Sequence, residues 1–151
     1  MCVVVAVDYA SFDGAQLPAQ ARSIIASELV GLLSVGTGRE SLVHAAQLAV
    51  SELVTNSVNA GASRISTRMT VHRDHVRVAV EDDAEGAPRP RQAGPSDSNG
   101  RGLAILASLG RSWGIEQLPS GKQVWVDLPV DAHLAASVAC HIANDANAVA
   151  G

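Results

Sequence analysis

Apolar residues recur along the chain with two different periods, and the period indicates which segments are helices and which are strands. A Val-rich run at residues 2–7 predicts a first strand. Over residues 18–33, and again over residues 40–60, apolar residues return every three or four positions, as they do on the buried face of a helix. Gly61 is a natural stop for the second of these predicted helices.

Strict alternation of apolar and polar residues predicts two β-hairpins. Residues 64–71 alternate, a polar turn follows, and residues 76–80 resume the alternation. Residues 113–117 and 122–128 form the second expected hairpin, joined by a Leu-Pro-Ser-Gly turn. With the two helices, these strands predict a two-layer α/β sandwich, in which helices cover one face of a mixed, mostly antiparallel sheet.

The segment between the two hairpins begins without a regular pattern. Residues 86–100 are rich in Gly, Pro and Ser, and they contain too few apolar residues to be buried. Loops of this length are uncommon in compact domains and are often functional lids. A short helix is expected at residues 103–109. We expect one domain over residues 1–130 and an Ala-rich helical extension over residues 131–151, for which a packing role is favoured over partner binding.

Composition restricts the kinds of molecule that the chain is expected to bind. The chain has 151 residues, of which 47% are hydrophobic and 3% aromatic, so the core is expected to consist of Val, Leu, Ile and Ala. The net charge is −4 and only 11 residues are Lys or Arg, with no basic cluster that could neutralise a run of phosphates. Direct nucleic-acid binding is therefore not expected.

The cysteines and the hydropathy bear on the compartment. Cys2 and Cys140 lie at opposite ends of the chain without metal-ligand spacing, which is not typical of an extracellular disulfide framework. No stretch approaches the roughly 20 apolar residues that a membrane span needs. We therefore expect a cytoplasmic protein with no membrane segment.

Glu52 and Asn56 are four residues apart on the second predicted helix, so they share one face. The simplest interpretation is a solvated polar face, because Glu-x-x-x-Asn is common by chance. However, residues 41–63 contain no Lys or Arg, and Glu52 is their only acid, which favours the wall of a pocket. An Asn oxygen can ligate Mg²⁺, and a carboxylate one turn away can accept a proton from an attacking hydroxyl or water.

Two further segments carry candidate chemistry. Residues 80–86 end a predicted strand with several acids and a glycine; an acid there can accept a hydrogen bond from an exocyclic amine, although an acidic hairpin turn is the more ordinary interpretation. Gly100-Arg101-Gly102 precedes the short predicted helix, where backbone N–H groups and the helix dipole favour an anion. As a lone Gly-x-Gly the motif is weak, since it lacks the Lys-Ser/Thr of a Walker loop.

The order of these motifs resembles the GHKL ATPase superfamily, which includes Hsp90, gyrase B, MutL and the ATP domain of histidine kinases. Within it, the chain is most similar to the bacterial anti-sigma-factor serine/threonine kinases. Residues 51–58 (SELVTNSV) resemble the N box of that family, residues 100–103 its second glycine box, and residues 113–114 with 121–125 its closing hairpin. The resemblance covers about residues 18–129.

The resemblance implies a Bergerat-type fold that binds ATP and Mg²⁺. Its members bind a sigma factor, phosphorylate a Ser or Thr of an antagonist protein, and are commonly dimeric, so a homodimer is one expected assembly. The implied roles are Glu52 as general base, Asn56 as Mg²⁺ ligand, Asp82 on the adenine amine, Gly86 beside the ring, and Gly100 and Gly102 around the phosphates, with Arg101 either adding charge there or remaining solvated.

Two departures from the family pattern keep a second function open. Ala84 stands where many members have Gly or Ser, and Gln123 falls where the family places a Thr whose hydroxyl supports the adenine-binding Asp. The alternative is a partner-binding regulatory module of the same fold with weak or no nucleotide binding. Glu52 and Asn56 favour the enzyme, whereas Gln123 favours the alternative. An ATP domain of a histidine kinase is disfavoured, because no helical hairpin with a phosphoacceptor His is apparent.

Overall fold

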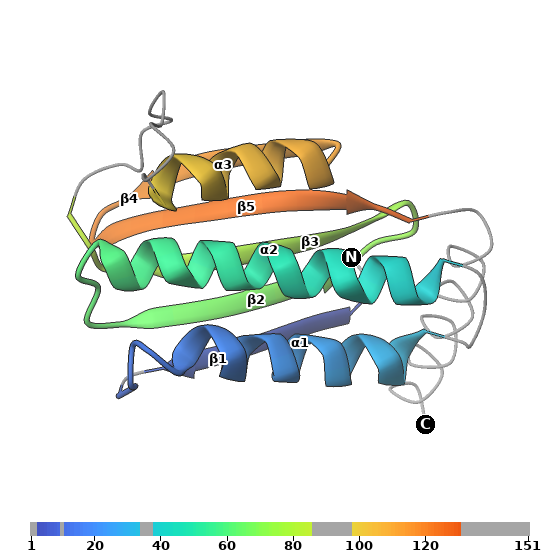
Figure 1. The fold of residues 1–151 in the computed structure, drawn as a ribbon, viewed down its shortest axis with the longest axis horizontal. Coiled ribbons are helices and arrows are strands. Elements are labelled where there is room, and N and C mark those ends of the chain that lie inside the picture. Colours follow the sequence, from blue (N-terminus) through green and yellow to red (C-terminus); the bar gives the residue numbers. More distant parts are fainter. Residues whose placement is uncertain (1–2, 10, 34–37, 86–97, 131–151) are drawn as a thin grey trace.

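A computed structural model describes residues 3–9, 11–33, 38–85 and 98–130, and Figure 1 shows their arrangement. In chain order, the helices and strands of these residues are β1 (Val3–Tyr9), α1 (Leu17–Leu32), α2 (Arg39–Asn59), β2 (Ile65–Val71), β3 (His75–Asp82), α3 (Ser98–Leu109), β4 (Ser112–Leu118) and β5 (Gly121–Pro129). Among the described residues, no helix combines the length and the hydropathy that a membrane crossing requires.

The strands form one sheet in the order β1-β2-β3-β5-β4, and each neighbouring pair is antiparallel. Figure 1 shows α1, α2 and α3 over the same face of this sheet, with α2 between the other two, and α2 packs against both of them. The predicted fold class, a two-layer α/β sandwich with helices on one face, is thereby confirmed. The expected domain boundary near residue 130 stays a prediction, because residues 131–151 lie outside the described residues.

The helices pack through the stripes that the sequence predicts. In α1 the buried residues recur about every fourth position, and Pro18 in the first turn occupies a position where its missing N–H costs no hydrogen bond. In α2 the buried apolar stripe is Leu42, Ala46, Ala49, Val50, Leu53 and Val54. Each buried Leu or Val contributes about 1.5–3 kcal/mol relative to an exposed one, so this central helix fixes the core.

Alternation along the strands decides which side chains meet the helices. The buried rows on the helix-facing side are Ile65, Thr67, Met69 and Val71 of β2, Val76, Val78, Val80 and Asp82 of β3, and Lys122, Val124, Val126 and Leu128 of β5. Asp82 and Lys122 are thus the polar ends of two otherwise largely apolar rows. The strand register also places them opposite each other, since Asp82 pairs with Lys122 between β3 and β5.

One predicted boundary is wrong. The short helix was expected to begin at Leu103, but α3 begins at Ser98, so Gly100, Arg101 and Gly102 lie within its first turns. The sequence here predicts a loop because glycine has low helix propensity. A helix terminus nevertheless tolerates glycine. Residues 86–97, which make up most of the predicted lid, lie outside the described residues.

Candidate functional site

The elements that carry the predicted site residues converge at one end of the molecule. The C-terminal half of α2, the end of β3, the beginning of β5 and the beginning of α3 all lie at the left of Figure 1. We call this region the Asp82 end. It brings Glu52 and Asn56 of α2 to the same end as Asp82 and the glycine motif Gly100-Arg101-Gly102, as the sequence analysis requires.

Asp82 is the best-defined polar group at this end. Its carboxylate accepts three hydrogen bonds: from the Ser57 hydroxyl to Oδ2 at 2.5 Å, from the Lys122 ammonium to Oδ1 at 2.9 Å, and from the Ala84 backbone N–H to Oδ1 at 3.0 Å. The side chains of Lys122 and Asp82 are only 3% and 1% exposed. A buried carboxylate needs such donors, because leaving it unpaired would cost several kcal/mol (about 3–5 when a buried pair is broken).

The contact of Ser57 with Asp82 joins the two halves of the predicted site. Ser57 directly follows Asn56 in α2, and its hydroxyl reaches the last residue of β3. Helix α2 and the acidic end of β3 are therefore in direct contact. Ser57 is not among the residues predicted from the sequence; its place in phase with the buried stripe of α2, beside Asn56, is the signal that could have identified it.

The residue of β5 that supports Asp82 is Lys122, and the prediction that Gln123 takes this place is wrong. Successive residues of a strand point to opposite faces, so Gln123, which pairs with Glu81, lies on the other side of the sheet from Asp82. Lys122 is in phase with the buried residues Val124 and Val126 of the same strand. The sequence signal for Lys122 is its position in the alternating row of buried residues of β5. An unpaired lysine is almost never buried, so a lysine in such a row indicates an acidic partner.

Gly121 fixes the backbone beside this pair. A Cβ atom at Gly121 would lie 1.8 Å from the carbonyl oxygen of Asp82, so only glycine permits the approach of β5 to the end of β3. The backbone that carries Lys122 is thereby held against the backbone that carries Asp82.

The neighbouring acid Asp83 has a different role. Its Oδ1 accepts backbone hydrogen bonds from Arg64 and Ser63 at 3.0 and 2.8 Å, and these bonds, that of Arg64 most, lower the pKa of Asp83. The carboxylate therefore holds the turn between α2 and β2. Of the acids between residues 81 and 85, Asp82 is the one that is buried on the helix-facing side of the sheet.

Glu52 and Asn56 are partly buried on α2. Arg22 of α1 donates a hydrogen bond to the Ser51 hydroxyl at 2.6 Å, so Ser51 marks the α1 side of the helix. A helix turns about 100° per residue, which places Glu52 and Asn56 about 100° and 140° around from Ser51. Both therefore lie on the side turned away from α1, and α3 flanks α2 on that side (Figure 1).

The glycine motif lies in the first turns of α3. The first N–H groups of a helix have no partner within it, so the N–H groups of residues 98–100 stand at the positive end of the helix dipole. The N–H of Gly102, in contrast, lies at the spacing that pairs with the carbonyl of Ser98. The expected anion site is therefore centred on the helix start and not on Gly102. Gly86 lies outside the described residues.

A hollow of about 270 Å³ adjoins Asp82 from another direction. It is lined by the ends of β1, β2 and β3, with Tyr9, Arg64 and Glu81 among its residues, and it includes neither Glu52 nor Asn56. It is therefore not the pocket that is expected beside Glu52 and Asn56.

Comparison with known proteins identifies the family. A model of the histidine kinase-like ATPase domain matches residues 15–128, which are 114 of the 151 residues. The chain belongs to this family. The matched span contains Glu52, Asn56, Ser57, Asp82 and Lys122. No curated protein matches the sequence.

A solved structure shows the same fold as this histidine kinase-like ATPase domain. The histidine kinase domain from the Erythrobacter litoralis EL346 blue-light activated histidine kinase has a TM-score of 0.50 at 20% identity, over 87% of this chain and 71% of that chain. A structure of the Erythrobacter litoralis EL346 blue-light activated histidine kinase has a TM-score of 0.47 at 23% identity, over 77% of this chain and 46% of that chain. This chain thus spans less than half of the latter, and identities this low concern the fold alone.

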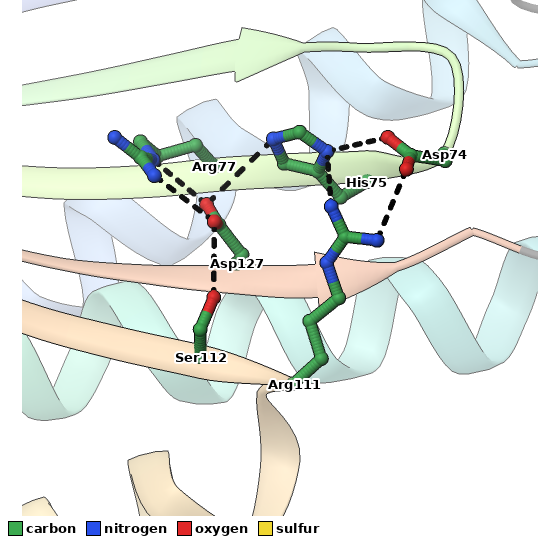
Figure 2. Close-up of polar contacts among 6 residues, drawn as sticks. All are labelled: Asp74, His75, Arg77, Arg111, Ser112 and Asp127. Carbon is green, nitrogen blue, oxygen red and sulfur yellow. Dashed lines mark hydrogen bonds and ion pairs between the residues drawn. The ribbon is translucent and has the colours of Figure 1, made fainter.

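The face of the sheet opposite the described helices, which we call the far face, carries a second ion pair of this ATPase domain (Figure 2). Arg77 of β3 donates to both carboxylate oxygens of Asp127 of β5 at 2.7 and 3.0 Å, and the Ser112 hydroxyl donates to Oδ2 at 3.2 Å. Burial would raise the pKa of Asp127, but the hydrogen bonds and charge of Arg77 outweigh it and lower the pKa. The Arg77 guanidinium also lies 3.9 Å from the ring centroid of Trp125.

A polar cluster continues along the far face at the turn between β2 and β3. Nδ1 of His75 lies 2.7 Å from Oδ1 of Asp74 and 2.8 Å from Nη2 of Arg111, and Arg111 also donates to Oδ2 of Asp74 at 3.1 Å (Figure 2). The hydrogen bonds of His75 and then of Arg111 lower the pKa of the exposed Asp74 to about 2. These contacts tie the turn to the start of β4 and lie at the opposite end of β3 from Asp82.

Proposed function

We propose that this chain binds Mg-ATP at the Asp82 end and acts as an anti-sigma-factor kinase, which holds a sigma factor and phosphorylates a Ser or Thr of an antagonist protein. The observation that supports the nucleotide site most is the hydrogen bond between Ser57 and Asp82, because it joins the helix of Glu52 and Asn56 to the proposed base-reading carboxylate. Membership of the histidine kinase-like ATPase family supports ATP binding. The sigma factor and the antagonist rest on the motif resemblance.

The types of residue present, a buried carboxylate and an amide on the neighbouring helix, suit an adenine nucleotide with a metal ion. Asp82 is a buried carboxylate on the helix side of β3, where it would accept a hydrogen bond from the adenine amine, with Gly86 beside the ring. Asn56 would offer its side-chain oxygen to Mg²⁺, which commonly takes few protein ligands together with substrate phosphates. In the part of the chain that the structure describes, no group of three or more His, Cys, Asp or Glu side chains could hold a metal alone, which agrees with a metal that arrives with the nucleotide.

The helix start of α3 is the proposed phosphate site. Its first N–H groups and the positive end of its dipole favour an anion, and Gly100 leaves room for the phosphates to approach the backbone. In the proposal Gly102, one residue beyond Arg101, would also let the phosphates approach the backbone. Arg101 would add a positive charge to this anion site.

Glu52 is the proposed general base. It lies on the same side of α2 as Asn56, one turn away, so a carboxylate would stand close to a metal ion held by Asn56. When bound, Mg-ATP supplies the phosphoryl group that is transferred. Glu52 would accept the proton of the substrate hydroxyl that attacks this phosphoryl group.

The second candidate function is a partner-binding module of the same fold with weak or no nucleotide binding. The observation that favours it is the ion pair of Lys122 with Asp82, because the ammonium holds the carboxylate that adenine would need. Both candidates predict that the chain binds a partner, and they differ in whether Mg-ATP stabilises the fold.

The nucleotide site is tested by the thermal unfolding of the wild type and of Asn56→Ala with Mg-ATP. A ligand that binds only the folded state raises the melting temperature, so millimolar Mg-ATP should raise that of the wild type, and Asn56→Ala should lose most of the rise. Asn59→Ala is the matched control, since Asn59 is an exposed amide on the same helix, and it should keep the rise. No rise in the wild type at millimolar Mg-ATP would favour the partner-binding module.

The kinase reaction has a separate test. Glu52→Ala should abolish phosphate transfer to the cognate antagonist protein, measured with labelled ATP, while ATP binding persists, because Glu52 acts on the hydroxyl proton and not on the nucleotide. Unchanged transfer by Glu52→Ala would remove Glu52 from the role of base.

A further inference from the structure

The carboxylate of Asp82 has no access for a nucleobase in the arrangement that the structure shows. Oδ1 accepts hydrogen bonds from the Lys122 ammonium and from the Ala84 N–H, which use both of its lone pairs, and Oδ2 accepts the Ser57 hydroxyl, which leaves one acceptor site on Oδ2. The side chain is 1% exposed. Because the carboxylate is enclosed, a base amine can reach the remaining site only if a side chain beside the carboxylate moves.

Lys122 is the donor that can move. Ser57 belongs to the buried face of α2, and the N–H of Ala84 is part of the backbone. The start of β5 is paired with the end of β3, with Lys122 opposite Asp82, so withdrawal of the strand that carries Lys122 would break the sheet at this point. The lysine side chain, in contrast, is a point charge on a four-carbon stem whose rotamers can change without movement of the backbone.

We infer that Lys122 sets the affinity of the nucleotide site: its ammonium competes with the 6-amino group of adenine for Asp82 and must leave the carboxylate before this amine binds. This inference rests on the proposed nucleotide site. It makes Lys122 a residue that determines affinity and base specificity, and it assigns Lys122 no part in phosphate transfer.

Exchanging the Lys122 ammonium for the adenine amine at Asp82 lowers the affinity for the nucleotide. A hydrogen bond from an ammonium to a carboxylate is about twice as strong as one from a neutral amine. Replacing the Lys122 ammonium by the adenine amine therefore loses part of the stabilisation of Asp82. When residue 122 is neutral, the carboxylate lacks this donor before binding and gains one on binding, so the same nucleotide should bind more tightly, by about tenfold.

The test is calorimetric titration of Mg-ATP into the wild type, Lys122→Thr and Gln123→Thr. Lys122→Thr should bind about tenfold more tightly than the wild type. Gln123→Thr is the matched control: it introduces the same residue at the next position of β5, on the other face of the sheet, and should bind like the wild type. Lys122→Met, which keeps the length of the side chain without its charge, replaces Lys122→Thr if circular dichroism shows that the latter does not fold.

A nucleotide without the amine separates competition at Asp82 from a general loosening of the site. Purine riboside triphosphate lacks the 6-amino group, so its affinity should be the same for the wild type and Lys122→Thr. A gain with both nucleotides would contradict the inference, because the effect would then not involve the amine.

The outcomes separate this inference from the proposed function. Tighter binding of ATP to Lys122→Thr supports it, including the case in which binding to the wild type is too weak to measure. Equal or weaker binding to Lys122→Thr overturns it and leaves nucleotide binding by the wild type intact. Failure of both folded proteins to bind Mg-ATP would refute the nucleotide site, and the role of Lys122 with it.

Discussion

The strand pair β3–β5 carries two cross-strand ion pairs, one on each face of the sheet. Asp82 and Lys122 are opposite each other on the helix-facing side, and Arg77 and Asp127 are opposite each other on the far face. In the first pair the side chains are 1% and 3% exposed, whereas in the second the carboxylate is 6% and the guanidinium 40% exposed. The same strands thus hold one pair that is enclosed and one that remains partly in water.

The difference indicates what each pair does. Arg77 binds Asp127 with two hydrogen bonds and lies on Trp125, so its planar group is held by several contacts. Lys122 binds Asp82 with one hydrogen bond from a flexible side chain. The far-face pair cross-links the strands through several contacts, while the pair at the Asp82 end is enclosed and, in our proposal, exchanges with a ligand.

The largest expected effect comes from breaking the enclosed pair. Asp82→Ala leaves the Lys122 ammonium buried without its carboxylate, and it should lower the free energy of unfolding by about 3–5 kcal/mol. The double variant Asp82→Leu/Lys122→Met removes both charges and should restore most of that loss. Urea unfolding measures both.

Asp127→Ala is the matched variant on the far face. It should cost about 1–2 kcal/mol, because the Arg77 guanidinium keeps its contact with water. If Asp127→Ala costs as much as Asp82→Ala, exposure does not distinguish the two pairs and the comparison fails.

A smaller effect is expected from the coupling within the far-face pair. A double-mutant cycle with Arg77→Met and Asp127→Asn should give a coupling free energy of about 0.5–1 kcal/mol. Because Arg77 is partly exposed, 1 M NaCl should reduce this coupling, since the screening length there is about 3 Å. The coupling of Asp82 with Lys122 should not change with salt, and an equal salt dependence of both pairs would contradict their different environments.

The smallest effect concerns acid stability at the turn between β2 and β3. Contacts with His75 and Arg111 lower the pKa of Asp74 to about 2, below its ordinary value near 3.8. The sign follows from the lowered pKa: this contribution to stability is present above about pH 4 and is lost as the pH falls towards 2. Asp74→Asn should therefore reduce stability slightly at neutral pH and flatten its decline between about pH 4 and 2, as measured by thermal unfolding across that range. An unchanged pH profile would show that the contacts of Asp74 with His75 and Arg111 contribute nothing to stability.

Local patterns in the sequence were sufficient for most of the fold. Helical periodicity located α1 and α2 within a residue or two, and alternation located both hairpins, because these patterns record which face of each element is buried. The strand order β1-β2-β3-β5-β4 depends on contacts between distant segments, which periodicity does not encode. The start of α3 was placed too late, because Gly100 and Gly102 favour a loop by propensity, whereas the structure includes them in the helix.

The candidate site was predicted in outline and not in its contacts. The residue types at Glu52, Asn56 and Asp82 suggested chemistry, and the fold brings their elements to one end. The partner of Asp82 was assigned to Gln123 by likeness to a family pattern, whereas the register of β5 places Lys122 there. A one-residue difference moves a strand side chain to the other face, so contacts of this kind require the register and not only the motif.

The comparison of the two regions leads to one direct measurement of the central claim, that nucleotide binds at the Asp82 end. Two-dimensional amide NMR spectra of the wild type, recorded while Mg-ATP is added to millimolar concentration, report on both regions at once. The account predicts that the amide signals of Ser57, Ala84 and Gly121 shift, while those of His75, Arg77 and Asp127 stay near their starting positions. Shifts confined to the second group, or no shifts at all, would contradict it.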